Sequence, residues 1–427
     1  AYEFILGLVG SEMCIRDRNN ILGVKGIAGH YTLDTGDGLV MIDAGSQLDI
    51  DTTYAEIKKW RPDTPVKAAI FTHHHVDHIF AVKHFDEENK KIGISKPIVY
   101  GHELMPDHFD RYIKTNDWNT AINRRQFAID VEHFKWPTEY RYPDITYKHD
   151  ISFKCGDLTF NLHHARGETD DHTWVHIPEE KLIAPGDLFI WAVPNGGNPQ
   201  KVQRYISDWA VALDEMLKLD CEIFLPGHGF PILGKKRIKK ALETTSKFLR
   251  SIEDQTLKLM NQGKSLNQVL HEVEIPNDLM ELPWLTPIYD DPQFLIRMIW
   301  RRYGGWWDGE YDRLLPAPRK EEALAWVELS NGIDNIILKA LEHLDKGNLK
   351  VAAQLIETAF HADNDNEQMH DARAKIYREF SLKQSSSMGR NILNHASMAS
   401  AQGKRDLAQT EDSVSYTHLT LPTIYSV

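Results

Sequence analysis

Short apolar runs broken by glycine and polar residues fill the first half of the chain, and this pattern predicts β-strands. Residues 24–42 carry such runs with a glycine at each break, as expected for hairpins. A helical pattern covers residues 51–60, and further strands are predicted at residues 68–71, 98–101, 158–164, 173–177 and 181–185. Strands that alternate with helices predict a layered α/β fold for this half.

The pattern becomes helical after Gly234 and stays so to about Arg405. Helices are predicted at residues 236–261, 266–273, 292–303, 321–347, 350–362 and 366–382. Gly263 and Pro276 separate some of them. Motif residues show no fixed period, so the pattern does not indicate a helical-repeat module. The second half is therefore expected to be an all-α domain.

A histidine-rich stretch at residues 72–78 stands between these predicted elements. His73 and His75 directly follow the predicted strand 68–71, so both imidazoles would reach the same side of the next turn. Asp77 and His78 follow at the predicted start of a helix. A single histidine usually has a structural role, whereas four ligand-type side chains in one turn favour two neighbouring cations.

This stretch resembles the metal-binding motif of the metallo-β-lactamase superfamily, and later motifs extend the resemblance. Asp43 resembles the early strand-end aspartate of that superfamily. The resemblance implies an αββα sandwich that holds two Zn²⁺ ions, with other divalent metals possible. It assigns His73, His75 and Glu168 to one metal, Asp77, His78 and His228 to the other, and Asp187 as the bridge.

Glu168 stands where β-lactamases, glyoxalases and related nucleases mostly carry a histidine. A carboxylate in either position, 168 or 187, could also simply cap a turn. Three carboxylates around two divalent cations leave a net charge of about +1, which still lowers the pKa of bound water. Diiron oxidoreductases of this superfamily usually carry Glu at the position of His75, so the sequence favours hydrolysis over redox chemistry.

The helical half looks like the dimerisation domain of the alkylsulfatases. The motif at residues 303–309, Asn331-Gly332 and residues 352–364 carry this resemblance, which covers residues 19–401. That subfamily also has Glu at the third-ligand position, although its bridging residue is usually Glu and not Asp. The resemblance implies a homodimer, and a sterol-carrier-like domain that follows in longer relatives.

Substrate contacts carry over only in part. Asn195 matches a sulfate-contacting asparagine of the family. The position of the family's arginine is occupied by Gln200, so Lys201 or Arg204 is expected to replace that arginine. The alternative is that these charged residues belong to a solvated loop and do not contact substrate. Tyr303 is expected near the substrate. The family's histidine, a candidate general acid, falls on Phe294. Sulfate leaves with little protonation, so this loss does not exclude sulfatase activity.

The leading hypothesis is a binuclear zinc hydrolase that cleaves alkyl sulfate esters. Asp77 and Asp187 would orient the attacking water, and the family implies attack at carbon with inversion, which releases sulfate and an alcohol. A hydrolase acting on another ester, a lactone or a phosphate ester is the alternative. A binding or scaffold protein with a structural metal site is a third possibility, which the complete set of seven ligands opposes.

Composition and net charge limit the kinds of binding partner that we expect for this chain. The chain has 62 acidic and 49 basic residues and a net charge of −13, which argues against nucleic acid as a partner but not against a small anionic substrate. No apolar run approaches the roughly 20 residues that span a bilayer. The compartment stays unknown. Cys155 and Cys221 show no paired spacing and are expected to be buried apolar residues.

The polar insertion at residues 103–134 is expected either to cover the site or to form a surface excursion.

Both chain ends look foreign: codons for residues 13–17, read on the opposite strand, encode residues 414–418. We interpret residues 8–18 and 413–423 as translated sequencing adapter. The predicted domains are 1–18 (artefact), 19–234 (metal-binding), 235–405 (helical) and 406–427 (tail, largely artefact).

Overall fold

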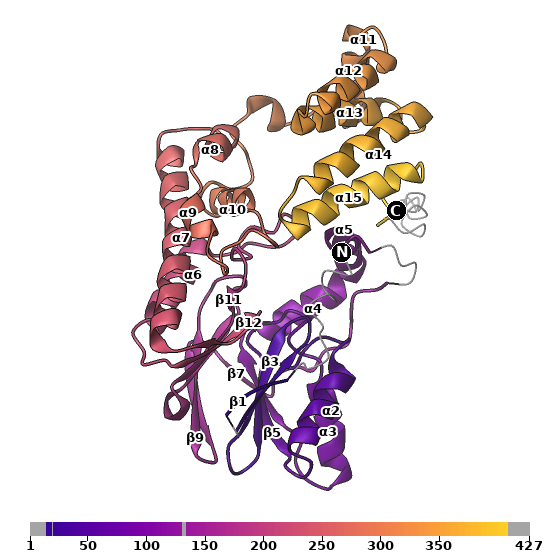
Figure 1. Cartoon of the computed structure of the whole chain (residues 1–427). Coiled ribbons are helices and arrows are strands. Elements are labelled where there is room, and N and C mark those ends of the chain that lie inside the picture. Colours follow the sequence, from indigo (N-terminus) through magenta and orange to yellow (C-terminus); the bar gives the residue numbers. More distant parts are fainter. Residues whose placement is uncertain (1–13, 19, 130–133, 409–427) are drawn as a thin grey trace, which may run out of the picture. The chain divides into compact units, whose positions relative to one another are not determined.

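A computed structural model describes residues 14–18, 20–129 and 134–408 (Figure 1). Contacts divide the chain into two compact units: Ala1–Asn116 with Pro137–Leu314, and Asp117–Trp136 with Leu315–Val427. The first unit therefore includes the first helices of the region predicted to be all-α. The four predicted domain ranges stay a prediction. Most of both suspected adapter segments lies outside the described residues, but Cys14–Arg18 forms strand β1.

The first sheet has seven strands in sequence order. Its strands are β1 (Cys14–Arg18), β2 (Ile21–Lys25), β3 (Gly29–Asp34), β4 (Leu39–Ile42), β5 (Val66–Ile70), β6 (Ile98–His102) and β7 (Ile145–Tyr147). Strands β1 to β4 pair antiparallel, and β4 to β7 pair parallel. Helices α2 (Ile50–Trp60) and α3 (Val82–Lys91) make two of the parallel connections.

The second sheet has six strands in the order β13-β12-β11-β10-β9-β8. They are β8 (Asp150–Cys155), β9 (Leu158–His164), β10 (Thr173–Ile177), β11 (Leu182–Ile190), β12 (Ile223–His228) and β13 (Ile232–Leu233). Only β11 and β12 pair parallel, joined through helix α6 (Ile206–Met216). This is a mixed sheet with a predicted hairpin, β10 and β11, at its centre.

Apolar side chains from both sheets meet in one core. Leu33, Ile70, Phe160, Leu162 and Leu225 are among its buried members. A second core on the other face of the second sheet packs α6, α7 (Lys235–Asn261), α8 (Leu266–Glu272) and α10 (Pro292–Gly304). With α2 and α3 along the first sheet, this gives the expected helix–sheet–sheet–helix order (Figure 1).

The second unit is helical. It contains α5 (Asn116–Phe127) from residue 117 on, α11 (Arg319–Leu329), α12 (Ile333–Asp345), α13 (Leu349–Ala362), α14 (Glu367–Leu382) and α15 (Ser387–Ala401). Ala340, Ile356, Ala359, Met369 and Ile376 form its core. Small residues at these crossing points allow close helix packing.

Several predicted boundaries need correction. The predicted helix 321–347 is two helices, because Asn331 (φ 56°) and Gly332 (φ 120°) adopt left-handed backbone that ends α11. Helix α3 begins at Val82, so Asp77 and His78 lie in a turn before it. Strand β11 continues past residue 185 to Ile190 and includes Asp187. Helices α4 (Met105–Lys114), α6 and α15 were not predicted.

Two smaller expectations can be compared with the structure. Cys221 is buried as expected, whereas Cys155 is half-buried at the sheet margin and accepts a hydrogen bond from the Thr35 hydroxyl. None of the helices in the described ranges combines the length and the apolar composition needed to cross a bilayer.

The core between the sheets makes one prediction about stability. Phe160 is fully buried there, so Phe160→Ala is expected to lower the free energy of unfolding by about 3–5 kcal/mol through lost burial and a residual cavity. Lys154→Ala, on the exposed face of neighbouring β8, is the control and is expected to change it by less than about 0.5 kcal/mol. Equal unfolding midpoints in urea for both variants would contradict the assignment of this core.

Candidate metal centre

The predicted ligands gather where strands of both sheets end. Strand β5 leads into the histidine turn, the loop after β9 carries Glu168, Asp187 lies in β11, and β12 ends at His228. The Thr173 amide donates to the Thr72 carbonyl oxygen (2.7 Å), which joins the two sheets at this edge. Residues far apart in sequence therefore meet at one place.

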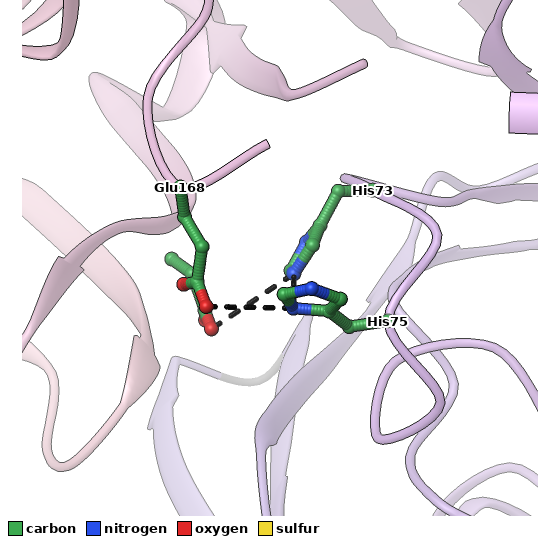
Figure 2. A group of neighbouring side chains, drawn as sticks. His73, His75 and Glu168 are labelled. Carbon is green, nitrogen blue, oxygen red and sulfur yellow. Dashed lines mark hydrogen bonds and ion pairs between the residues drawn. The ribbon is translucent and has the colours of Figure 1, made fainter. Parts of the chain in front are cut away.

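The first group contains His73, His75, Glu168 and Asp187, whose ligand atoms all lie within 4.8 Å of one another. His73 Nε2 is 2.9 Å from His75 Nδ1, and His75 Nδ1 is 3.5 Å from Glu168 Oε1. Figure 2 shows the Glu168 carboxylate, which comes from the loop after β9, directed at the His75 imidazole, with His73 beside it. This group unites the three residues assigned to one metal with the assigned bridge.

The second group contains Asp77, His78 and His228, again with ligand atoms within 4.8 Å. Asp187 faces both groups: its Oδ2 is 3.2 Å from His228 Nε2 and 3.9 Å from His73 Nε2, and its Oδ1 is 3.5 Å from His78 Nε2. The structure thus brings all seven predicted ligands together, with Asp187 between the two groups.

Asp43 supports the histidine turn at residues 72–78 through hydrogen bonds. It adopts φ 60°, and its carboxylate accepts hydrogen bonds from the Thr72 amide (2.8 Å) and the Thr72 hydroxyl (3.0 Å). The same carboxylate lies 2.8 Å from His78 Nδ1. Because Nδ1 is engaged there, His78 presents Nε2 to the second group, an arrangement typical of metal-binding histidines.

The chemistry of the buried atoms fits a divalent metal pair. Glu168 Oε2, Asp187 Oδ1 and His78 Nε2 are buried without a hydrogen-bond partner among the described residues. Unpaired buried polar atoms cost free energy unless another group binds them. Burial, with the neighbouring imidazoles, holds the pKa of His73 and His75 well below the usual range, so both stay neutral as metal ligands must. The ligand roles themselves stay a prediction.

A buried polar cluster positions Glu168. Arg204 Nη1 donates to Glu168 Oε1 (2.6 Å) and also to the Asn195 carbonyl oxygen, and the Asn195 amide donates to the same Oε1 (2.5 Å). Burial raises the pKa of Glu168 to about 8, although the Arg204 guanidinium opposes this shift. Two of the predicted substrate contacts therefore touch a predicted metal ligand.

The other predicted substrate contacts differ in position. Lys201 lies in the same electrostatic environment, since burial and the guanidiniums of Arg204 and Arg111 lower its pKa to about 7. Tyr303 is half exposed at the end of α10, and its hydroxyl bonds Glu253 (3.0 Å) and Ser207 (2.9 Å). The hydrogen-bond partners of the Tyr303 hydroxyl are therefore not among the seven predicted metal ligands.

Sequence reasoning missed a third cluster beside the histidine turn. His74 Nδ1 donates to Asp171 (2.9 Å), its ring stacks on that of His108 (4.1 Å), and Arg111 Nη2 donates to His74 Nε2 (3.2 Å). Both His74 nitrogens are thus engaged, which favours a supporting network over a third metal site. The signal for this cluster in the sequence was the acidic pair Asp170-Asp171, which follows Glu168 closely. Helix α4 supplies His108 and Arg111, so this part of the insertion borders the site.

Family models match both halves of the chain. The metallo-beta-lactamase superfamily matches residues 30–228, and the alkyl sulfatase dimerisation family matches residues 265–403. The chain therefore contains both kinds of domain. The first of these matches spans all seven predicted ligands.

Several relatives of the chain are alkylsulfatases. A linear primary-alkylsulfatase from Pseudomonas sp. is 24% identical over 366 residues, which cover 81% of this chain and 69% of that protein. An (R)-specific secondary-alkylsulfatase from Pseudomonas sp. is 23% identical and covers 88% and 60%. The solved structure of the stereoselective inverting sec-alkylsulfatase Pisa1 from Pseudomonas sp. has a TM-score of 0.83 at 20% identity, over 91% of this chain and 66% of that one. The fold is therefore shared.

Gly227 of β12 lies so close to Asp187 that a substitution there is expected to change metal affinity. A Cβ at Gly227 would lie 2.0 Å from Asp187 Oδ1 and 2.7 Å from the backbone of Gly186, so Gly227→Ala must displace the carboxylate. We expect zinc affinity to fall about tenfold or more, measured by competition with a chelator. Gly304→Ala is the control, because its Cβ would meet only the flexible end of Met260 (3.1 Å). Equal zinc affinity in both variants would contradict this geometry.

Proposed function

We propose that this chain, which combines a metallo-β-lactamase superfamily domain with an alkyl sulfatase dimerisation domain, is a binuclear zinc hydrolase of alkyl sulfate esters. The observation that carries the proposal is the pair of ligand groups with Asp187 between them. When bound, the metal pair would supply the positive charge that acidifies a water molecule and polarises the ester. Alkylsulfatase relatives along most of the chain support the sulfate ester as substrate.

The reaction would add the oxygen of one water to the carbon that carries the sulfate. The carbon–oxygen bond breaks, sulfate leaves with the bonding electrons, and the water's proton is released. Asp77 and Asp187 would accept hydrogen bonds from the water and so orient it toward the carbon. Asn195 and Arg204 would act through Glu168, which they hold in place. Lys201 would face the anionic group.

The absence of a general acid at Phe294 is compatible with this leaving group. Leu295, the neighbouring position, is fully buried, and the Phe294 backbone packs against Gly197. A sulfate monoester needs little proton donation, whereas a poorer leaving group would need more. The lack of an acid at this position is therefore compatible with a sulfate ester, and the alternative hydrolase can be tested on the same protein.

We also propose that the helical region forms a homodimer. The family model at residues 265–403 describes dimerisation, and α11 exposes Trp326 (53%) and Leu329 (74%). Large apolar side chains exposed on one helix commonly mark a protein interface. A second copy of this chain is the expected partner.

The first test measures sulfate release. The zinc-loaded chain is expected to release sulfate from decyl and dodecyl sulfate, with kcat/KM at least about 100-fold above that of Glu168→Ala, because the variant loses a carboxylate of the first ligand group. A phosphate monoester and a carboxylic ester of the same chain length are the comparison substrates. Hydrolysis of either comparison substrate in preference to the sulfates would replace this proposal with the alternative hydrolase. A metal-replete, folded chain inactive on all of them would favour the scaffold.

The second test measures mass in solution. Sedimentation is expected to give twice the mass of one chain, and Trp326→Glu with Leu329→Glu is expected to give monomers, because two charges would be buried in the interface. Val211→Glu, at an exposed apolar position of α6, is the matched control and should leave the dimer intact. A monomeric unmodified chain would refute the homodimer.

A further inference from the structure

Arg204 is committed to Glu168 through one nitrogen of its guanidinium. Its guanidinium and the carboxylate of Glu168 are almost fully buried as an ion pair, with 2.6 Å between Arg204 Nη1 and Glu168 Oε1, and the same nitrogen donates to the Asn195 carbonyl oxygen. Breaking a buried pair leaves an uncompensated charge, which costs several kcal/mol. A substrate anion would have to compete with that carboxylate. A cation that is not paired with a carboxylate would therefore bind the anion more readily than Arg204.

Arg111 is less buried than Arg204 and, in the described part of the chain, is not paired with a carboxylate. It projects from α4, is half-buried, and uses only Nη2 in a hydrogen bond, to His74 Nε2 (3.2 Å). Across the ranges that the structure describes, no carboxylate forms an ion pair with Arg111. An arginine carries five N–H donors, so most of its fork remains able to bind an anion.

Arg111 stands beside the candidate metal centre. His74, which it contacts, has its ring 5.0 Å from that of His75. Lys201 lies in the loop between Asn195 and Arg204, both of which contact Glu168, and the charges of Arg204 and Arg111 add to burial in lowering its pKa. Two cations from different segments, α4 and the loop before α6, thus border the first ligand group. A partly desolvated cation pair attracts an anion more strongly than surface charges do.

We propose that Arg111, together with Lys201, binds the anionic sulfate group of the substrate and positions it against the first ligand group. This inference rests on the proposed function for the identity of the anion. It assigns the role of the missing family arginine, where this chain has Gln200, to a residue contributed by the insertion. Arg111 would be a substrate-binding residue that contacts the anion and not the reacting carbon.

The test uses inorganic sulfate as the probe on the zinc-loaded full chain. Calorimetric titration is expected to show sulfate affinity about tenfold or more weaker in Arg111→Ala, with a smaller loss in Arg111→Lys, which keeps the charge but not the planar fork. Lys114→Ala, an exposed cation one turn later on the same helix, is the control and should bind sulfate as the unmodified chain does. Zinc content is measured for every variant.

Kinetics separates this role from a purely structural one. With decyl sulfate, Arg111→Ala should raise KM about tenfold and change kcat much less. Unchanged sulfate affinity in Arg111→Ala would overturn the inference, and so would a loss of sulfate affinity that accompanies loss of zinc, since Arg111 would then act through His74. If sulfate binding depends on Arg111 but no sulfate ester is hydrolysed, the proposed function fails while the anion site stands.

Discussion

The structure depends on keeping several carboxylates buried at one sheet edge. Asp43, Glu168, Asp171 and Asp187 are each nearly inaccessible to solvent, which is costly for ionised groups unless each finds partners. Asp43 accepts from Thr72, Asp171 pairs with His74, and Glu168 pairs with Arg204. Asp187 faces three imidazoles and the Glu168 carboxylate, and its Oδ1 has no hydrogen-bond partner among the described residues. The support network thus leaves a carboxylate oxygen without a hydrogen-bond partner at the place where a divalent cation would bind.

Much of the fold follows from local patterns in the sequence. Strands β9 and β10 have the predicted bounds, and α2, α7 and α13 begin within one residue of them, because apolar periodicity and glycine breaks are strong there. The predictions were wrong at the turn before α3, where a helix start was expected, and at the break between α11 and α12, where one continuous helix was expected. In both places left-handed or irregular backbone, and not periodicity, decides the boundary.

The candidate site was predictable only where side chains lie close to strand ends in a known motif. Its seven residues gather as expected, but the partners of each residue could not be read from sequence. Whether Arg204 faces a substrate or Glu168 depends on a contact across 36 residues, and Arg111 reaches the site only because α4 packs beside the histidine turn. Long-range packing decides which of several similar cations remains available.

The second unit is built from two distant stretches of chain, and this has a consequence for its synthesis. Arg125 of α5 donates to Asp406 (2.8 Å), across 281 residues. A ribosome that adds roughly 5–20 residues per second would make α5 about 15–60 s before Asp406. During that interval α5 has none of its late-made partners. The second unit can therefore be completed only after the sequence of the first unit has been synthesised.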